Sequence, residues 1–207
     1  MGVMHDDADF EPVETMDLVG GDVALDFVNT ASGRDGAGGL REKLLAYGDL
    51  VTWAERVGLA PESLGRRLRA AAAMDSAGAA AVLERARELR EAVFRLFARP
   101  DPAETDLDRV AREAGEAGAQ RRLVEEADAY AFEWPESDRL DQVLWPVALA
   151  AADLLTSPHD RHRVKECAAD DCNWLFLDQS RNQSRRWCDM KVCGNRAKAR
   201  RFSERHR

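Results

Sequence analysis

The feature that most constrains this chain of 207 residues is a group of four cysteines confined to its last 41 residues. They are Cys167, Cys172, Cys188 and Cys193, in the spacing C-x4-C-x15-C-x4-C. Two close pairs joined by a loop are typical of tetrahedral zinc, because each pair supplies two corners and the loop brings the pairs together. The sequence therefore predicts that these four thiolates bind one structural Zn²⁺.

The sequence gives less support to other roles for these cysteines. Disulfides are disfavoured because the start of the chain, MGVMHDDADF, is acidic and lacks the apolar run of a secretory signal, which points to the reducing cytoplasm. A catalytic or redox dithiol more often has the spacing C-x-x-C. His159 and His162 lie near Cys167 and stay open as alternative zinc ligands.

The segment around the cysteines, residues 159–207, predicts a small ββα zinc finger. Fewer than 50 residues bury too little apolar surface to fold alone, so metal binding is expected to supply much of the folding free energy. Residues 174–178 alternate as a strand, and residues 185–188 are expected to return antiparallel to it. A basic helix is predicted from Gly194 to about Arg205, with a face that packs on the first strand. That face consists of Ala199, Phe202 and His206, and its expected partners are Trp174 and Phe176.

The preceding part of the chain predicts a mainly α domain over residues 16–158, after an acidic, disordered N-terminus over residues 1–15. Apolar residues recur at helical spacing in several segments. In the first half, helices are predicted over 23–30 with Asp22 as N-cap (a strand is the alternative), over 44–57 ending before Gly58, and from Pro61. Further helices are predicted from a Ser76 cap to Pro100, from an Asp101 cap, and over 137–155 with a Ser137 cap and a kink at Pro146. Residues 33–39 are rich in glycine and predict a flexible loop. Residues 130–134 alternate as a strand, and residues 121–124 are its expected hairpin partner.

Charge divides the chain into two unlike parts. From Arg161 onward there are 13 Lys and Arg against 6 Asp and Glu, a net charge of +7. Because the whole chain has a net charge of −8, the first 160 residues carry −15. A basic end on an acidic body is expected where that end meets a polyanion. The candidate nucleic-acid contacts are Arg181, Arg185, Arg186, Lys191, Asn195, Arg196, Lys198, Arg200 and Arg201. Two structural uses of this charge stay open: attraction to the acidic body, and compensation of the −2 charge of a four-thiolate zinc site.

The cysteine-rich end closely resembles the CGNR zinc finger family. The resemblance rests on Cys172-Asn173-Trp174-Leu175-Phe176-Leu177-Asp178, on Arg185-Arg186-Trp187-Cys188-Asp189-Met190 and on Cys193-Gly194-Asn195-Arg196-Ala197-Lys198. In that family the finger usually follows an α-rich ABATE domain, and residues 20–30 and 47–54 look like landmarks of that domain. The resemblance implies a bacterial, stress-linked transcription regulator whose zinc-dependent finger binds DNA. It implies the four cysteines as ligands and leaves open whether Asn195 and Arg196 contact DNA or brace the zinc site.

The residues also leave other partners open, namely RNA, a small-molecule effector and a second copy of the chain. RNA is an alternative partner if Trp174, Phe176 and Trp187 stack on bases. Asp26, Asn29, Thr30 and Arg34 lie near a glycine turn and are candidates for a small-molecule effector pocket, although ordinary capping and turn bonds are the favoured explanation for them. The body is expected to sense a signal or to form a homodimer.

No enzyme and no membrane protein is expected. His5, His159, His162 and His206 lie in the tails or the linker, and no serine or cysteine has an evident base. The longest apolar stretch, residues 144–155, is too short to span a bilayer, so a cytoplasmic protein is predicted.

Overall fold

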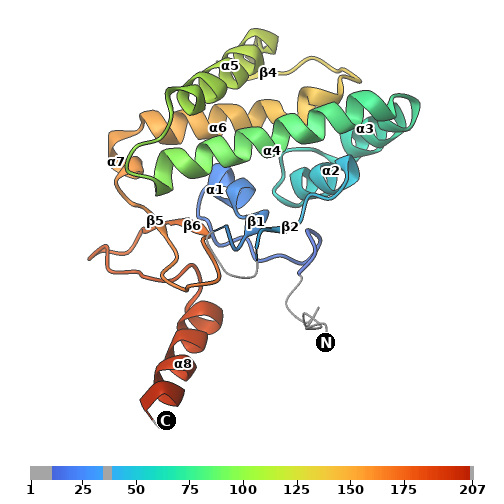
Figure 1. The fold of residues 1–207 in the computed structure, drawn as a ribbon. Helices are drawn as coiled ribbons and strands as arrows, with labels where there is room; N and C mark the ends of the chain where they lie inside the picture. Colours follow the sequence, from blue (N-terminus) through green and yellow to red (C-terminus); the bar gives the residue numbers. More distant parts are fainter. Residues whose placement is uncertain (1–10, 35–38, 206–207) are drawn as a thin grey trace, which may run out of the picture.

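The structure is a computed structural model that describes residues 11–34 and 39–205. The chain forms a helical body followed by a small finger of two short strands and a projecting helix (Figure 1). The helices of the body are α1 (Val23–Val28), α2 (Tyr47–Arg56), α3 (Glu62–Met74), α4 (Ser76–Ala98), α5 (Glu104–Gln120), α6 (Trp145–Thr156), α7 (Pro158–Arg161) and the 3-10 helix η2 (Leu140–Leu144). The expected fold class, a mainly helical domain with a small zinc finger, is confirmed.

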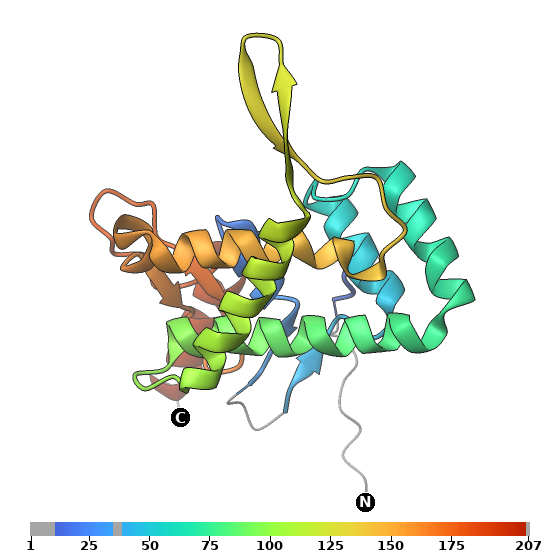
Figure 2. The same cartoon turned by 90° about the horizontal axis from the view of Figure 1, so that it is seen from above.

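The body is built around α4. Helix α5 packs across α4 and α6, and α1 lies against the same two helices (Figures 1 and 2). The face of α4 that carries Leu83, Leu89 and Val93 is buried, as its helical spacing predicts. Because burial of each such side chain contributes about 1.5–3 kcal/mol, this apolar face fixes α4 as the core helix.

Two predicted helix boundaries of the N-terminal half are confirmed. The Asp22 carboxylate accepts a hydrogen bond of 2.8 Å from the Ala24 backbone N–H and caps α1, so this segment is a helix and not a strand. Gly58 follows α2 with φ +77°, the left-handed conformation that glycine adopts at low cost.

Two predicted caps are wrong. Helix α4 is capped by Asp75, whose carboxylate accepts from the Gly78 backbone N–H at 2.8 Å, and Ser76 is the first helical residue. Helix α5 begins at Glu104, with Ala103 at the N-cap position. Asp101 does not serve there, because the helix starts two residues beyond Pro102 and Asp101 lies two residues before the N-cap position.

The predicted helix over residues 137–155 is in fact two helices, η2 and α6. Pro146 lies in the first turn of α6, where its missing N–H needs no acceptor, so it starts a helix and does not kink one. The Ser137 hydroxyl accepts from the Arg139 backbone N–H at 3.1 Å in the turn before η2 and caps no α-helix.

The N-terminal residues 1–10 lie outside the described residues, but residues 11–15 do not fit the predicted disorder. Val13 is 1% exposed and belongs to the hydrophobic core, and Arg56 donates to the backbone carbonyls of Val13 and Met16. The prediction of disorder is therefore wrong for residues 11–15, because the core recruits apolar side chains from this polar segment.

Two β-hairpins extend from the body. Strands β1 (Ala31–Ser32) and β2 (Arg41–Glu42) pair antiparallel around the predicted glycine loop, of which residues 35–38 lie outside the described residues. Strands β3 (Arg122–Glu126) and β4 (Ala129–Glu133) pair antiparallel with Leu123 opposite Phe132, which confirms the predicted hairpin.

The finger contains the predicted two strands and helix, but one strand was misassigned. Strand β6 (Leu175–Leu177) pairs antiparallel with β5 (Val164–Glu166), whereas residues 185–188 form no strand. The reason is burial: all three residues of β6 are buried between β5 and the body, so its second edge faces α1. The segment 185–188 is instead held by isolated backbone hydrogen bonds, such as the one that the Ala168 N–H donates to the Arg186 carbonyl at 2.9 Å.

The finger and the body share one hydrophobic core. The fully buried Asn29 side chain donates to the Leu175 carbonyl at 2.9 Å and accepts from the Leu175 N–H at 2.8 Å, as a backbone partner of β6 would. The Leu177 N–H donates to the Gly20 carbonyl at 2.7 Å. Trp174, Leu175 and Phe176 belong to the same buried cluster as the helices. The finger therefore does not rest on its metal alone, contrary to the expectation of a terminus without a core.

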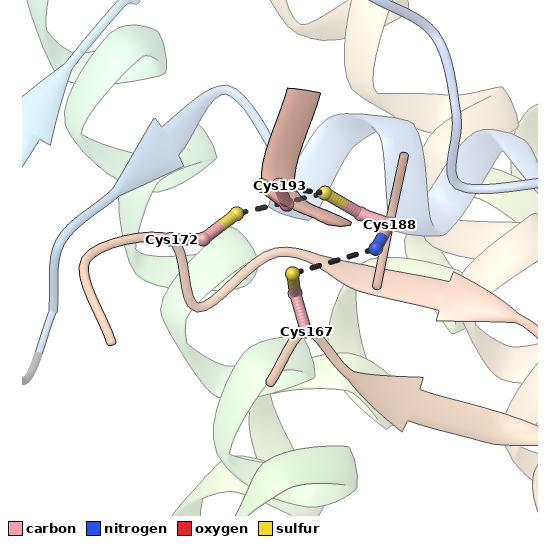
Figure 3. A group of neighbouring side chains, drawn as sticks. All are labelled: Cys167, Cys172, Cys188 and Cys193. Atoms are coloured by element: carbon pink, nitrogen blue, oxygen red, sulfur yellow. Dashed lines mark hydrogen bonds between the residues drawn. The ribbon is translucent and has the colours of Figure 1, made fainter. Parts of the chain in front are cut away.

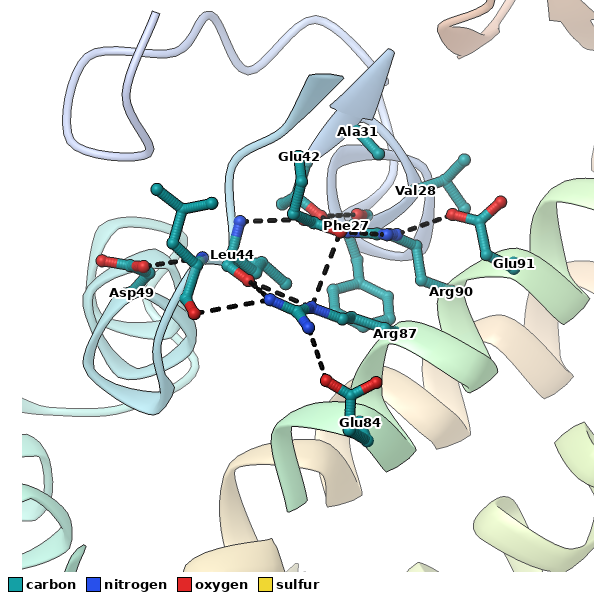
Figure 4. A network of polar contacts seen from close by, with 12 residues as sticks. Phe27, Val28, Ala31, Glu42, Leu44, Asp49, Glu84, Arg87, Arg90 and Glu91 are labelled. Carbon is teal, nitrogen blue, oxygen red and sulfur yellow. Dashed lines mark hydrogen bonds and ion pairs between the residues drawn. The ribbon is translucent and has the colours of Figure 1, made fainter. Parts of the chain in front are cut away.

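A buried ion network joins α4 to the β1–β2 hairpin (Figure 4). The Arg90 guanidinium, 1% exposed, contacts both carboxylate oxygens of Glu42 at 2.6 Å and one of Glu91 at 2.9 Å. Burial by itself would raise the pKa of Glu42, but the hydrogen bonds and charge of Arg90 lower it. The neighbouring Arg87 donates to the Leu44 carbonyl, so α4 holds both the end of β2 and the residues that follow it.

Candidate metal centre and its basic surface

The four cysteines come from four separate pieces of the finger. Cys167 follows β5, Cys172 precedes β6, Cys188 ends the long loop, and Cys193 lies in a π-helical turn, η3 (Met190–Gly194). The Sγ atoms all lie within 4.8 Å of one another, and each cysteine is 2–6% exposed (Figure 3). The predicted convergence of the two pairs is confirmed.

The geometry and chemistry of this donor set fit one zinc ion. The Sγ atom of Cys188 lies 3.6 Å from those of Cys172 and Cys193, close to the edge of about 3.8 Å expected for a tetrahedron with Zn–S bonds of about 2.3 Å. Hydrogen bonding to Cys167 raises the pKa of Cys172 and Cys188, because crowded, buried thiols cannot all ionise. A divalent cation at the centre would favour four thiolates, so the site is suited to one structural Zn²⁺.

Two hydrogen bonds to sulfur help to offset the negative charge of the thiolates. The Cys188 backbone N–H donates to the Cys167 Sγ at 3.4 Å, and Arg196 Nη2 donates to the Cys193 Sγ at 3.4 Å. Arg196 also forms an ion pair of 3.4 Å with Asp171 and is only partly exposed. Arg196 thus braces the zinc site, which is the structural alternative raised from the sequence.

The turn that delivers Cys193 is held by side chains at both ends. The Asp189 carboxylate accepts from the Val192 backbone N–H at 2.8 Å, and Asn195 Nδ2 donates to the Lys191 carbonyl at 2.9 Å. Asn195 therefore acts as a donor to the preceding turn and is not the N-cap acceptor of the last helix, α8 (Asn195–Arg205).

Arg185 is likewise used inside the finger. Its guanidinium lies 4.3 Å from the centre of the Phe176 ring and donates to the Trp187 carbonyl at 3.0 Å and to the Cys188 carbonyl. These contacts fix the loop that carries the third cysteine. As positioned, this arginine is engaged with the protein itself.

The fully buried Asp178 is a key residue that the sequence patterns did not single out. Its carboxylate accepts from Lys165 Nζ at 2.6 Å, from the Ser180 hydroxyl at 2.6 Å and from the Arg185 backbone N–H at 3.0 Å. Burial opposes ionisation, but these donors outweigh it and lower the pKa of Asp178. An acidic residue that directly follows an apolar strand was the only available signal.

The other candidate cations lie on the surface. Arg181, Arg186, Lys191, Lys198 and Arg201 are exposed and form no ion pair within residues 11–34 and 39–205. Arg200 is also exposed but pairs with Asp170 and Asp171 at 3.1 Å. Arg186 and Arg201 line a common cleft of ≈ 400 Å³ between α8 and the cysteine loops.

The expected packing of α8 on the strands is wrong. Phe202 is 65% exposed, and Ala199 is exposed as well, while His206 lies outside the described residues. Trp174 and Phe176 are instead buried against the body. Because the body supplies that apolar contact, α8 projects away from it (Figure 1).

The four residues proposed for an effector pocket are each bonded to other parts of the protein. Asp26 accepts from the Gly20 N–H at 2.8 Å, Thr30 Oγ1 donates to the Phe27 carbonyl at 2.7 Å, and Asn29 holds Leu175 as described above. Arg34 pairs with Glu91 at 2.8 Å. All four side chains therefore have structural roles, as hydrogen-bond or ion-pair partners of other residues.

A different cleft lies between the β1–β2 hairpin and the zinc knuckle. It has a volume of ≈ 340 Å³, and its lining includes Ser32, Arg41, Lys43, Trp174 and Arg196 as well as three of the cysteines. The Trp174 Nε1 atom is buried and has no hydrogen-bond partner among the described residues. Sequence patterns gave no signal for this cleft, because its lining is scattered along the chain.

No helix among the described residues is both long enough and apolar enough to cross a membrane. Comparison with curated proteins gave no significant match. The model of the CGNR zinc finger family matches residues 163–206 and so covers all four cysteines. The model of the ABATE family, described as "Putative stress-induced transcription regulator", matches residues 21–158, the helical body. The chain therefore belongs to the ABATE family and carries a CGNR zinc finger at its C-terminal end.

Proposed function

We propose that this regulator binds the backbone of duplex DNA through the exposed cations of its finger. The observation that carries the proposal is the separation of the basic residues into two groups. Arg185 and Arg196 hold the cysteine loops, whereas Arg181, Arg186, Lys191, Lys198 and Arg201 face solvent.

The position of α8 supports this role. Lys198 and Arg201 are three residues apart and therefore lie on one flank of the helix. Arg201 shares a cleft with Arg186, so cations from α8 and from the long loop converge. A row of cations on a rigid support neutralises successive phosphates and releases their counterions.

The zinc site would act indirectly, by holding α8 at a fixed angle to the loop. Cys193 lies two residues before the start of α8, and Cys188 lies two residues after Arg186. Loss of the metal is therefore expected to uncouple the cations from one another and to weaken binding. The expected setting is the reducing cytoplasm, in which four thiolates stay available for zinc.

Binding of single-stranded RNA by base stacking is the less favoured alternative. Trp174 and Phe176 are buried, so they offer no face for a base, and only Trp187 is partly exposed. In a competition assay, duplex DNA is expected to displace a labelled duplex more effectively than single-stranded RNA. Stronger competition by the RNA would reverse this assignment.

The central test is fluorescence anisotropy of a labelled duplex across a salt series. The logarithm of the association constant is expected to fall linearly with the logarithm of salt concentration, with a slope of about 0.9 per phosphate contacted. The double variant Lys198→Gln/Arg201→Gln should lower that slope by about 2. The control Arg66→Gln removes an exposed cation from α3, far from the finger, and should leave the slope unchanged.

Two results would count against the proposal. A slope near zero for the native protein would exclude phosphate binding. A double variant that binds like the native protein would show that α8 is not the contact surface. Repeating the salt series after the zinc has been chelated tests whether DNA binding depends on the metal, and weaker binding is expected.

We propose a second, smaller role for the body, the binding of a small-molecule effector. It is supported by the cleft beside the zinc knuckle and by the unpartnered Trp174 Nε1 in its lining. Native mass spectrometry of the purified protein is expected to show a bound molecule besides zinc, with reduced occupancy in Trp174→Phe. A spectrum with zinc alone, from native protein and variant alike, would contradict it. No catalytic role is proposed.

A further inference from the structure

The β3–β4 hairpin projects from the body (Figure 2), and three of its large apolar side chains are exposed. Leu123 is 60% exposed, Tyr130 71% and Phe132 58%. At the base of the hairpin, Arg121 lies 4.4 Å from the centre of the Phe132 ring. A two-stranded hairpin is marginally stable by itself, and contiguous exposed apolar side chains usually mark an interaction site. Within residues 11–34 and 39–205, these three side chains therefore stay uncovered.

The register identifies which backbone groups are free. Glu126 pairs with Ala129 across the two-residue turn, so this pair and every second pair beyond it exchange backbone hydrogen bonds. The peptide groups of Tyr130 and Phe132 fall in the intervening pairs and point away from β3. No backbone hydrogen bond outside the hairpin is made by either residue within the described part of the chain. β4 is therefore an open edge strand.

The sequence of β4, Ala-Tyr-Ala-Phe-Glu, is self-complementary about its central Ala131. If two copies pair antiparallel about a two-fold axis at Ala131, Tyr130 of each lies opposite Phe132 of the other. These are the residues whose peptide groups point outward, so the same arrangement forms the backbone bonds and two aromatic cross-strand pairs.

The other edge of the hairpin is less suitable. Antiparallel pairing of β3 with itself about Val124 would place Leu123 opposite Glu125 of the second copy. That arrangement sets an apolar side chain against a carboxylate and gains no aromatic pair. Chemistry and register therefore both favour β4.

We propose that β4 is a dimerisation strand, which joins two copies of this chain into a four-stranded antiparallel sheet with Ala131 on the two-fold axis. The interface is isologous, so it closes after two copies and leaves no open-ended assembly. It does not depend on nucleic-acid binding, and it would bring two basic fingers into one particle.

A cysteine placed on the axis tests the register directly. In the dimer the two Ala131 Cα atoms would be about 4.5 Å apart, within the range of a disulfide, whereas the two Val124 Cα atoms would be about 14 Å apart. Ala131→Cys should therefore form a covalent dimer under mild oxidation on a non-reducing gel. The matched control Val124→Cys lies on the same face one strand away and should stay uncrosslinked beyond the native background.

The oligomeric state provides the second measurement. Light scattering after size exclusion should give twice the chain mass for the native protein. Tyr130→Thr/Phe132→Thr should weaken the dimer about ten-fold or more, while Leu123→Thr changes it less. Both variants keep a strand-forming residue, and circular dichroism checks that the helical body is intact.

Three results would overturn the proposal. They are a native monomer at concentrations of tens of micromolar, preferential crosslinking of Val124→Cys, and a dimer that is insensitive to Tyr130→Thr/Phe132→Thr. Crosslinking through Val124 would point to β3 as the interface instead.

Discussion

Asn29 offers the sharpest test of how the finger is attached to the body. Its side chain is fully buried and makes two hydrogen bonds with the backbone of Leu175, at 2.8 and 2.9 Å. Asn29→Ala removes both bonds and leaves one buried N–H and one buried C=O without a partner. Since each unsatisfied buried group costs about 1–3 kcal/mol, the free energy of unfolding should fall by about 2–4 kcal/mol.

Urea denaturation of the zinc-loaded protein measures this loss, followed in parallel by tryptophan fluorescence and far-ultraviolet circular dichroism. Because finger and body share one core, both signals should report a single transition at the same midpoint. Asn182→Ala, an exposed asparagine in the same finger, should change stability by less than about 0.5 kcal/mol.

A loss of less than about 0.5 kcal/mol in Asn29→Ala would refute this role of Asn29, since the two bonds would then contribute nothing measurable. Separate transitions by fluorescence and circular dichroism in the native protein would refute the shared core. Separate transitions would mean that the finger folds independently of the helices.

Three further predictions concern the metal, the buried ion network and pH. Cys188→Ser should lower zinc from one equivalent to a small fraction, as measured by elemental analysis, while a control with native cysteines retains it. Arg90→Met should destabilise the protein by about 3–5 kcal/mol in thermal or urea unfolding, because the partly buried Glu42 would lose its two short bonds to Arg90 and Glu91 would keep only Arg34; adding Glu42→Gln should restore part of the loss. Burial raises the pKa of Asp26 from 3.8 to about 6, so the folded state holds an extra proton between these values and this contribution to stability is lost as pH rises through 6. Asp26→Asn should therefore flatten the change in melting temperature between about pH 4 and 6, and an unaltered profile would contradict the assignment.

Local patterns in the sequence were sufficient for the metal site and for most helices. Ligand type and spacing are local properties, so the four cysteines could be identified as one set before their sulfurs were seen together. The apolar stripe of α4 and the alternation of β4 likewise depend on neighbours in the chain, and both elements formed where predicted. The errors at Ser76 and Asp101 concern single caps, for which several nearby residues compete.

The roles of individual polar residues were not determined in this way. Arg185, Arg196 and Arg201 look alike in the sequence, yet the first two hold the cysteine loops and the third faces solvent. Asn29 was a candidate for a pocket, with a turn or capping role favoured, and it serves instead as a backbone partner for a strand 146 residues away. The neighbour of β6 was misassigned for the same reason.

The sequence by itself thus determined that the chain has a helical body and a C-terminal zinc site, because periodicity and ligand spacing are encoded over a few residues. Only the tertiary structure decided which cations remain exposed, which strand pairs with β6, and that finger and body form one core. Those outcomes depend on burial and on contacts between segments distant in the chain. The energy of a buried polar group is set by the partner that it meets, and that partner is fixed only when the whole chain has folded.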